Sequence, residues 1–185
     1  MKLLIAIDRD GTLIKNDDFF GRSKTWQTEL RFNADVIDLL SYLQTKHKTT
    51  KIVVTNQSGV ARRWFTHNRV EEINRFISKY LKARGVTVNN WQYCPDVDAN
   101  YAKMHTEHKF NPHYIKIKTK RKPDPAMIFE GLKKLKMRIN QFDQIIILGD
   151  RNEDAELAKN VNGKYLDVKN KTYNELCSEF TELIT

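Results

Sequence analysis

Apolar runs that end in acidic residues occur near both ends of the sequence, and they constrain the fold more than any other feature. Residues 3–7 lead into Asp8-Arg9-Asp10-Gly11-Thr12, and residues 145–148 lead into Gly149-Asp150. Uninterrupted apolar runs of this length are typical of strands buried on both faces of a parallel sheet. Strand residues alternate in direction, and open α/β sheets bind ligands at their carboxyl edge. We therefore expect Asp8 and Asp10 to face a ligand site there.

Helical patterns alternate with these runs along the chain. The apolar, β-rich runs cover residues 3–7, 51–55, 86–93, 145–149 and 164–168. The intervening helical patterns cover residues 33–46, 68–84, 125–137 and 153–160. Strands that alternate with helices predict an α/β fold, with helices on both faces of a parallel sheet. The apolar stripes of the helices, such as Val70, Ile73 and Ile77, are expected in the core.

Length and composition fit one compact domain. A chain of 185 residues can bury about 70% of the surface that its unfolded form exposes, so we predict a single domain over residues 1–185. Cys94 and Cys177 are too few for a disulfide framework. Asp8 interrupts the apolar N-terminal segment too early for a signal peptide, and no apolar stretch approaches the roughly 20 residues that span a bilayer. We predict a cytoplasmic protein without membrane contact, as a monomer or a small homo-oligomer.

Four short motifs follow one another in a recognisable order. The first is Asp8-Arg9-Asp10-Gly11-Thr12, and the second is Thr55-Asn56-Gln57-Ser58-Gly59 after the apolar residues 52–54. The third is Arg121-Lys122-Pro123-Asp124-Pro125, and the fourth is Gly149-Asp150-Arg151-Asn152-Glu153-Asp154. In type and order they resemble the motifs of the haloacid dehalogenase (HAD) superfamily of phosphotransfer enzymes. One such motif is a weak signal, but four in order over most of the chain are a strong one.

The resemblance implies a Rossmann-like three-layer sandwich and a magnesium-dependent phosphatase. Asp8 would attack phosphorus to form an aspartyl-phosphate, and Asp10 would be the general acid and then the general base. Mg²⁺ would be held by Asp8, the backbone carbonyl of Asp10 and Asp150. The residues that would bind the phosphate are Thr55, Asn56, Arg121 and Lys122. The supporting residues would be Thr12, Arg151 and Asp154, the last of them behind the metal ligands or joined to the metal through water.

Arg9 narrows the resemblance, because many members of the superfamily carry a hydrophobic residue between the two acids. Together with the second and third motifs it is similar to subfamily IIIA, which contains histidinol-phosphate and D,D-heptose 1,7-bisphosphate phosphatases. Polynucleotide 3′-phosphatases are a related branch. We expect hydrolysis of a phosphorylated small metabolite of the sugar phosphate or histidinol-phosphate type. The alternatives are a 3′-phosphatase for DNA or RNA ends and a non-catalytic phosphate-binding scaffold. The intact motif acids argue against a scaffold.

The zinc loop of that branch is mostly missing here. The family places Cys-Pro-His after the third strand and Cys-x-Cys before Arg-Lys-Pro. This chain has Cys94-Pro95-Asp96 and Lys118-Thr119-Lys120 instead. Three of the four zinc ligands are therefore absent, and the family site is not expected. A rearranged site of Cys94 with His105, His108 and His113 stays open, although loop histidines are more often simply solvated.

Residues 94–120 form a basic insert between the third strand and the third motif. The basic residues of the insert and of the motif that follows it are Lys103, Lys109, Lys116, Lys118, Lys120, Arg121 and Lys122. With a net charge of +9, they would attract an anionic substrate. They would also suit a nucleic-acid groove in which Tyr101, Phe110 and Tyr114 stack on bases. A Lys-rich solvated surface is the third interpretation.

The remaining segments near the motifs leave no room for a cap domain. Between Thr12 and Phe32 there is space for a flap, whose aromatic residues Phe19, Phe20 and Trp26 could close over a ligand. After the second motif, Arg62, Arg63 and Trp64 could add contacts. An essentially capless enzyme has an open site, so the insert is expected to be the main determinant of specificity.

Overall fold

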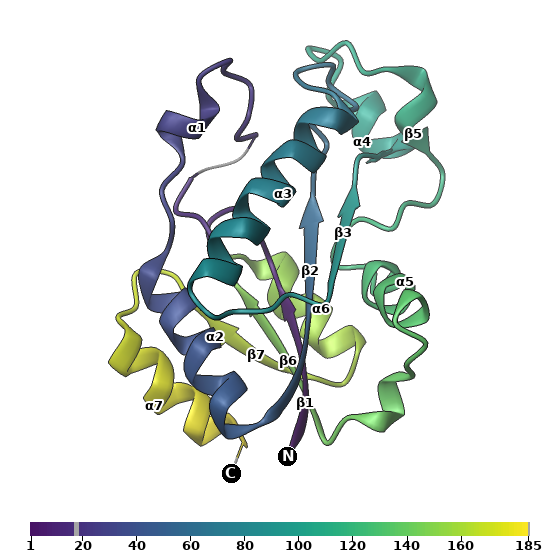
Figure 1. Ribbon diagram of the computed structural model, residues 1–185. Helices are drawn as coiled ribbons and strands as arrows, with labels where there is room; N and C mark the ends of the chain where they lie inside the picture. The colour runs from purple at the N-terminus through teal and green to yellow at the C-terminus, as the bar shows by residue number, and fades with distance from the viewer. Residues whose placement is uncertain (17–18, 185) are drawn as a thin grey trace.

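A computed structural model describes residues 1–16 and 19–184 of the chain. Five strands form one parallel sheet with the order β3-β2-β1-β6-β7 (Figure 1). The strands are β1 (Lys2–Ile7), β2 (Lys48–Asn56), β3 (Asn90–Cys94), β6 (Gln144–Gly149) and β7 (Lys164–Asp167). Because all five strands run in one direction, the segments that follow β1, β2 and β6 lie at the same edge of the sheet, the one formed by the carboxyl ends of the strands.

Helices cover both faces of the sheet (Figure 1). Those on one face are α2 (Ala34–Lys46), α3 (His67–Ala83) and α7 (Tyr173–Ile184). Those on the other face are α5 (Ala126–Lys134) and α6 (Asn152–Asn160). A short 3₁₀ turn, η2 (Ile139–Gln141), precedes β6. This is the predicted three-layer α/β sandwich with a parallel central sheet.

Alternation along β1 divides the hydrophobic core in two. Leu3, Ile5 and Ile7 pack in the cluster on the side of α2, α3 and α7, whereas Leu4 and Ala6 pack in the cluster on the side of α5 and α6. All five side chains are fully buried. Burial of a Leu or Ile side chain contributes about 1.5–3 kcal/mol. The central strand therefore joins the two layers and holds the segment that follows it in place.

The third strand begins later than predicted. The pattern of residues 86–93 predicts a strand from Val86, but β3 starts at Asn90. Gly85 has a φ of +77° and ends α3, and the N–H of Val86 then donates to the carbonyl of Leu81 at 2.9 Å. Residues 86–89 are consequently the connection that brings the chain from α3 to the sheet.

The C-terminal helix α7 was not predicted. The sequence feature that marks its start is Thr172 followed by Glu175, a helix-capping pattern. In the structure, Glu175 accepts hydrogen bonds from the backbone N–H and the hydroxyl of Thr172 at 2.8 and 2.7 Å. Leu176 and Phe180 then bury an apolar stripe in the core. The N–H of Tyr173 donates to Asp35 of α2 at 3.0 Å, which joins the two helices.

The flap differs from the prediction in what its aromatic rings do. Phe20 and Trp26 belong to the buried core cluster, and the Trp26 ring meets Phe76 of α3 at a centroid distance of 5.4 Å. Trp26 begins the short helix α1 (Trp26–Glu29). The expectation that Phe20 and Trp26 close over a ligand is therefore wrong, because both rings are buried in the core and Trp26 attaches the flap to α3. Phe19 alone of the three lines the cavity described below.

The basic insert is folded and packs against the rest of the molecule. Its elements are β4 (Val97–Asp98), α4 (Ala99–Met104), η1 (Pro112–Tyr114) and β5 (Ile115–Lys116). The N–H of Asn111 donates to the carbonyl of Ala61 at 2.8 Å, and Tyr114 shares a hydrogen bond of 2.8 Å with His67 of α3. The insert thus lies beside the loop that follows the second motif (Figure 1).

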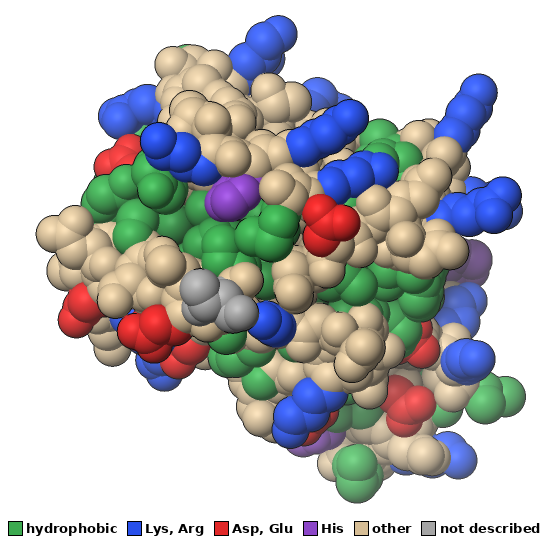
Figure 2. Space-filling view, turned by 90° about the horizontal axis from the view of Figure 1, so that it is seen from below, with side chains coloured by type: hydrophobic (Ala, Val, Ile, Leu, Met, Phe, Trp, Pro, Cys, Tyr) green, Lys and Arg blue, Asp and Glu red, His purple; other side chains and the backbone are tan. Residues whose placement is uncertain are grey.

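Basic residues are dispersed on the face of the molecule shown in Figure 2. Lys and Arg side chains are spread over this face with acidic side chains between them, and they do not gather into one patch. Among the described residues, no helix has the length and apolarity required to cross a bilayer. A cytoplasmic location, the oligomeric state and the single-domain organisation stay predictions.

Candidate active site

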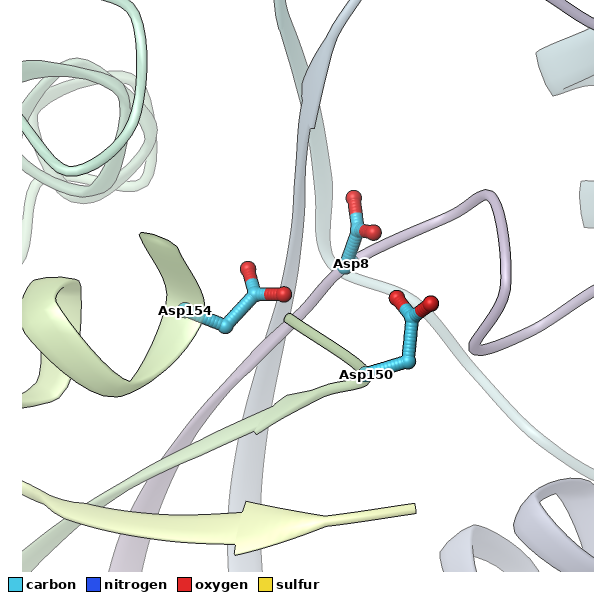
Figure 3. Close-up of side chains that lie close together, drawn as sticks. All are labelled: Asp8, Asp150 and Asp154. Carbon is cyan, nitrogen blue, oxygen red and sulfur yellow. The ribbon is translucent and has the colours of Figure 1, made fainter. Parts of the chain in front are cut away.

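Three carboxylates converge at the carboxyl edge of the sheet. Asp8 follows β1, Asp150 follows β6, and Asp154 lies in the first turn of α6. One oxygen of each lies within 4.8 Å of the others, and Figure 3 shows the three side chains around a shared space. The N–H of Asp8 donates to the carbonyl of Leu148 at 2.9 Å. The pairing of β1 with β6 thus continues to the nucleophile that the sequence predicts and holds its backbone.

Two glycines make this approach of carboxylates sterically feasible. A Cβ atom on Gly11 would lie 2.3 Å from Oδ2 of Asp150, and one on Gly149 would lie 2.3 Å from the Asp154 carboxyl group. Such contacts are far shorter than van der Waals distances. Gly11 also has a φ of +82°, which disfavours any other residue. The glycines of the first and fourth motifs therefore leave space for the acids of the fourth.

Lys122 lies between two of the carboxylates. Its Nζ is 2.7 Å from Oδ1 of Asp8 and 2.7 Å from Oδ1 of Asp154, and its side chain is buried. Burial alone would lower the pKa of Lys122, but the two carboxylates outweigh it and raise the pKa above its usual value. The ammonium group is therefore charged and offsets part of the negative charge of the cluster.

The carboxylate cluster fits a hard divalent cation. Oδ1 of Asp150 and Oδ2 of Asp154 are buried and lack a hydrogen-bond partner among the described residues. Burial, followed by the charge of Asp8, raises the pKa of Asp150. Burial also raises the pKa of Asp154 to about 6, although Lys122 opposes the shift. Buried, unpartnered carboxylate oxygens that repel one another are the ligands that Mg²⁺ prefers.

Asp10 shares the cavity with Asp8 but has a different set of partners. Arg9 binds both of its oxygens at 2.9 Å, and Nε2 of Gln57 donates to Oδ2 at 2.6 Å. Burial raises the pKa of Asp10, whereas the charge of Arg9 opposes the rise. Gln57 and Asn74, which accepts from Arg9 at 3.0 Å, were not among the predicted site residues. Gln57 could have been found because it lies within the second motif, whereas no motif in the sequence marks Asn74 as a site residue.

The second motif connects the phosphate-binding candidates. The Thr55 hydroxyl accepts from Gln57 at 2.9 Å and lines the cavity. Oδ1 of Asn56 accepts from the N–H of Lys122 at 2.9 Å, and its Nδ2 donates to Glu153 at 3.0 Å. Asn56 therefore holds the third and fourth motifs together. Thr12 is fully buried, and its hydroxyl has no partner among the described residues.

A cavity of about 290 Å³ opens beside Asp8 and Asp10. Its other lining residues are Phe19, Thr55, Asn56, Ser58, Arg62, Tyr101, His108, Arg121, Arg151 and Glu153. Three of these are arginines, so the lining combines guanidinium groups with the acids. Arg121 is 3.7 Å from Glu153 and Arg151 is 3.6 Å from Asp150, and both side chains are partly exposed. Guanidinium groups at the cavity wall suit the oxygens of a phosphate ester.

Arg62 joins the insert to the cavity. Its Nη1 donates to the Ser58 hydroxyl at 2.6 Å, and its Nη2 donates to the Tyr101 hydroxyl at 2.9 Å. The guanidinium carbon lies within 5.6 Å of four aromatic rings, those of Phe19, Trp64, Tyr101 and Phe110. Of the three residues predicted to add contacts after the second motif, Arg62 lines the cavity, whereas Arg63 is exposed outside it.

The aromatic residues of the insert are half-buried and contact neighbouring side chains. The Phe110 ring lies against Arg62, and the Tyr114 hydroxyl is bonded to His67. Of the three proposed stacking residues, Tyr101 lines the cavity, and Phe110 and Tyr114 do not. Phe110 and Tyr114 thus also hold the insert in place, and their role as stacking platforms stays a prediction.

The rearranged zinc site has no support in the geometry. Cys94 is buried in the core cluster with α5, and burial raises the pKa of its thiol to about 11. His105 and His108 lie near Glu107, while His113 packs against Tyr114. Among residues 1–16 and 19–184, the group whose ligand atoms converge is that of Asp8, Asp150 and Asp154.

Comparison with known proteins agrees with this site. A family model described as polynucleotide kinase 3 phosphatase matches residues 3–177. A probable D-glycero-D-manno-heptose-1,7-bisphosphate 7-phosphatase from Thermoplasma volcanium is 31% identical over 162 residues, 87% of this chain and 94% of that protein. The chain belongs to the family that this model describes, polynucleotide kinase 3 phosphatase. As a HAD phosphatase it is a hydrolase of phosphoric monoesters, which confirms the resemblance carried by the four motifs.

Solved structures share the fold of this HAD phosphatase. A protein from Mesorhizobium loti described as a HAD-like phosphatase matches with a TM-score of 0.74 at 22% identity, over 97% of this chain and 84% of that chain. D,D-heptose 1,7-bisphosphate phosphatase from B. bronchiseptica, complexed with magnesium and phosphate, matches with a TM-score of 0.67 at 22% identity, over 97% and 87% of the two chains. At this identity the likeness concerns the fold, and it confirms the predicted α/β class.

Proposed function

We propose that this HAD phosphatase is a magnesium-dependent phosphomonoesterase that hydrolyses a phosphorylated sugar through an aspartyl-phosphate on Asp8. The observation that carries the proposal is the position of Lys122, whose Nζ lies 2.7 Å from Asp8 and from Asp154. A buried ammonium group there offsets the charges that would otherwise keep a phosphate dianion away from a carboxylate nucleophile. The reaction then needs a group that gives a proton to the leaving oxygen, and Asp10 lines the same cavity.

The proposed reaction has two steps, in which Asp8 displaces the leaving group from phosphorus and water then displaces Asp8. A carboxylate oxygen of Asp8 bonds to phosphorus as the ester bond breaks, and the leaving oxygen takes a proton from Asp10. Asp10 then accepts a proton from water as the water oxygen displaces Asp8 from phosphorus. Thr55 and Lys122 donate to the phosphate oxygens. Mg²⁺, held by Asp8, the carbonyl of Asp10 and Asp150, with Asp154 alongside, would supply electrostatic stabilisation of the transferred phosphoryl group.

Cavity size and charge support a small anionic substrate. About 290 Å³ is at the lower end of the volumes of small-molecule sites. The relative from Thermoplasma volcanium is named as a heptose bisphosphatase, and the protein from B. bronchiseptica was solved with magnesium and phosphate. Arg121 and Arg151 at the wall are placed to bind a charged or hydroxyl-rich substrate.

Phosphate release with Mg²⁺ tests the proposal. We would compare kcat/KM for heptose 1,7-bisphosphate, other sugar phosphates, histidinol phosphate and a 3′-phosphorylated oligonucleotide, with Asp8→Asn as the blank. The expected result is a preference of at least about 10²-fold for a sugar phosphate, equivalent to about 2.7 kcal/mol in the transition state. Hydrolysis by Asp8→Asn near the wild-type rate would contradict the covalent mechanism.

A polynucleotide 3′-phosphatase is the second candidate, favoured by the description of the matching family model and by the basic insert. The structure weakens it, because Lys120 pairs with Glu130 and Lys122 is buried beside Asp8. If this candidate holds, affinity for a 3′-phosphorylated single strand should fall steeply with salt, with a slope of about −0.7 per phosphate contacted. Binding that is independent of salt would exclude it.

A further inference from the structure

Arg9 folds back on the residue that follows it. Its Nε donates to Oδ1 of Asp10 and its Nη2 donates to Oδ2, each at 2.9 Å, so that the guanidinium group grips the carboxylate with two parallel bonds. The Arg9 side chain is fully buried, and the Asp10 carboxylate is nearly so. A two-bond pair of this kind sets both the position and the plane of the carboxylate. It is a restraint on Asp10 that a hydrophobic residue at position 9 cannot supply.

Helix α3 holds the guanidinium group from its other side. Oδ1 of Asn74 accepts from Nη1 of Arg9 at 3.0 Å, and Asn74 is buried. On this helix the flanking buried positions Val70, Ile73 and Ile77 are apolar. An amide on a buried apolar face is costly unless it is hydrogen-bonded, and Arg9 provides the bond. Asn74 therefore fixes Arg9 as Arg9 fixes Asp10.

Counting acceptor sites shows which oxygen of Asp10 is left for chemistry. A carboxylate offers about four lone-pair sites, two on each oxygen. Oδ2 accepts from Arg9 and, at 2.6 Å, from Gln57, which fills both of its sites. Oδ1 accepts from Arg9 alone among the described residues. One acceptor site on Oδ1 therefore remains, on a side chain that lines the cavity.

We propose that Arg9 and Asn74 are positioning residues for proton transfer, and that the proton moves on and off Oδ1 of Asp10. The inference rests on the proposed function and specifies how its acid-base step is arranged. As the ester P–O bond breaks and the Asp8–phosphorus bond forms, the electron pair goes to the leaving oxygen, which takes the proton from Oδ1. As water then displaces Asp8, a water proton returns to Oδ1 and inorganic phosphate departs.

The test compares two substrates that differ in their need for an acid. With p-nitrophenyl phosphate the leaving group departs without a proton, whereas the alkoxide of a sugar phosphate requires one. In Arg9→Met we expect an unchanged first turnover of p-nitrophenyl phosphate, seen as a burst of one nitrophenolate per enzyme, followed by slow turnover because water is activated poorly. With the sugar phosphate preferred by the wild type, kcat should fall by about 10²-fold, within the usual contribution of acid-base catalysis, and KM should change little.

Further variants separate positioning from folding. Asn74→Ala keeps Arg9 and should show the same burst with a smaller loss, so it carries the test if Arg9→Met does not fold. In an Asp10→Asn background, Arg9→Met should add no further loss, whereas a merely structural role would add one. Lys51→Met, which removes a buried cation of β2 that does not line the cavity, is the control and should keep wild-type kinetics.

Two outcomes would overturn the inference. Equal losses on both substrates without a burst would show that Arg9 supports the fold of the site in general. Wild-type kinetics in Arg9→Met and Asn74→Ala would show that Asp10 needs no restraint. Both are distinct from failure of the proposed function, in which the wild-type enzyme itself releases no phosphate from any phosphomonoester.

Discussion

Lys122 is the residue on which the charge balance of the site depends, since it contacts Asp8 and Asp154 at 2.7 Å inside the protein. We expect Lys122→Met to lower kcat by about 10²–10³-fold, as the loss of one transition-state donor does. Without Mg²⁺ it should also lower the free energy of unfolding by about 3 kcal/mol at pH 8, because two buried carboxylates lose their partner. Urea unfolding in EDTA measures the second effect. Unchanged stability would show that the carboxylates do not depend on Lys122.

Lys51 is a buried cation outside the site. It lies near the start of β2, where its Nζ donates to the neutral partners Gln44 and Thr49 at 3.0 and 2.8 Å. Burial lowers the pKa of Lys51 to about 8. Between about pH 8 and the ordinary lysine pKa of about 10.4, the unfolded chain therefore binds more protons than the folded protein. Lys51 consequently lowers the free energy of unfolding below pH 8, and this loss of stability disappears as the pH rises.

Lys51→Met should consequently stabilise the protein in a pH-dependent way. We expect a gain of up to about 3 kcal/mol at pH 7 that shrinks towards zero near pH 10.5. Urea unfolding at a series of pH values measures it, and the exposed Lys118→Met is the matched control, for which no gain is expected. A gain that is constant with pH would mean that packing, not the charge of Lys51, is responsible.

At the scale of elements, the attachment of the insert to the second motif determines the shape of the cavity. Arg62 makes this attachment through Ser58, Tyr101 and the surrounding rings. We expect Arg62→Met to raise KM by about tenfold, equivalent to about 1.4 kcal/mol of binding, with a smaller change in kcat. Hydrogen exchange should also become faster in residues 97–116. An unchanged exchange pattern would show that Asn111 and Tyr114 suffice to hold the insert.

At the scale of the whole molecule, metal binding is linked to folding, since the three carboxylates come from segments that only the folded sheet brings together. At a concentration of 100 times its dissociation constant, Mg²⁺ should raise the free energy of unfolding by about 2.7 kcal/mol. Asp150→Asn should remove most of this gain. Thermal unfolding with Mg²⁺ and with EDTA measures it, and an equal gain in Asp150→Asn would place the metal elsewhere.

The same linkage predicts a pH dependence. The pKa of Asp154 is raised to about 6 by burial, so in the absence of metal the folded protein binds more protons than the unfolded chain between about pH 4 and pH 6. The stability contributed by protonated Asp154 is complete below about pH 4 and is lost as pH rises through 6. Mg²⁺ should therefore stabilise the protein more at pH 8 than at pH 5. A gain independent of pH would contradict the assignment.

The sequence by itself determined the sheet, its parallel direction and the edge at which the acids meet. Residues 3–7 and 145–149 are apolar without interruption, as in strands buried on both faces, and helical patterns between such runs predict a parallel sheet. The candidate site residues Asp8, Lys122 and Asp150 were predicted because the short motifs that contain them resemble those of the HAD superfamily. Local patterns of this kind are read directly from consecutive residues.

Only the tertiary structure decided which partner each polar or aromatic side chain has. Asn74 binds Arg9 across 65 positions, and Phe20 and Trp26 join the core beside α3 and not the cavity. The same holds for Lys51, whose burial depends on the neighbouring segments. Periodicity states which face of an element is apolar, but a hydrogen bond or ring contact between distant segments depends on how the elements pack. The acids, and Phe19 and Arg62 at the cavity, were therefore predictable, whereas the hydrogen bonds that hold Asp10 were not.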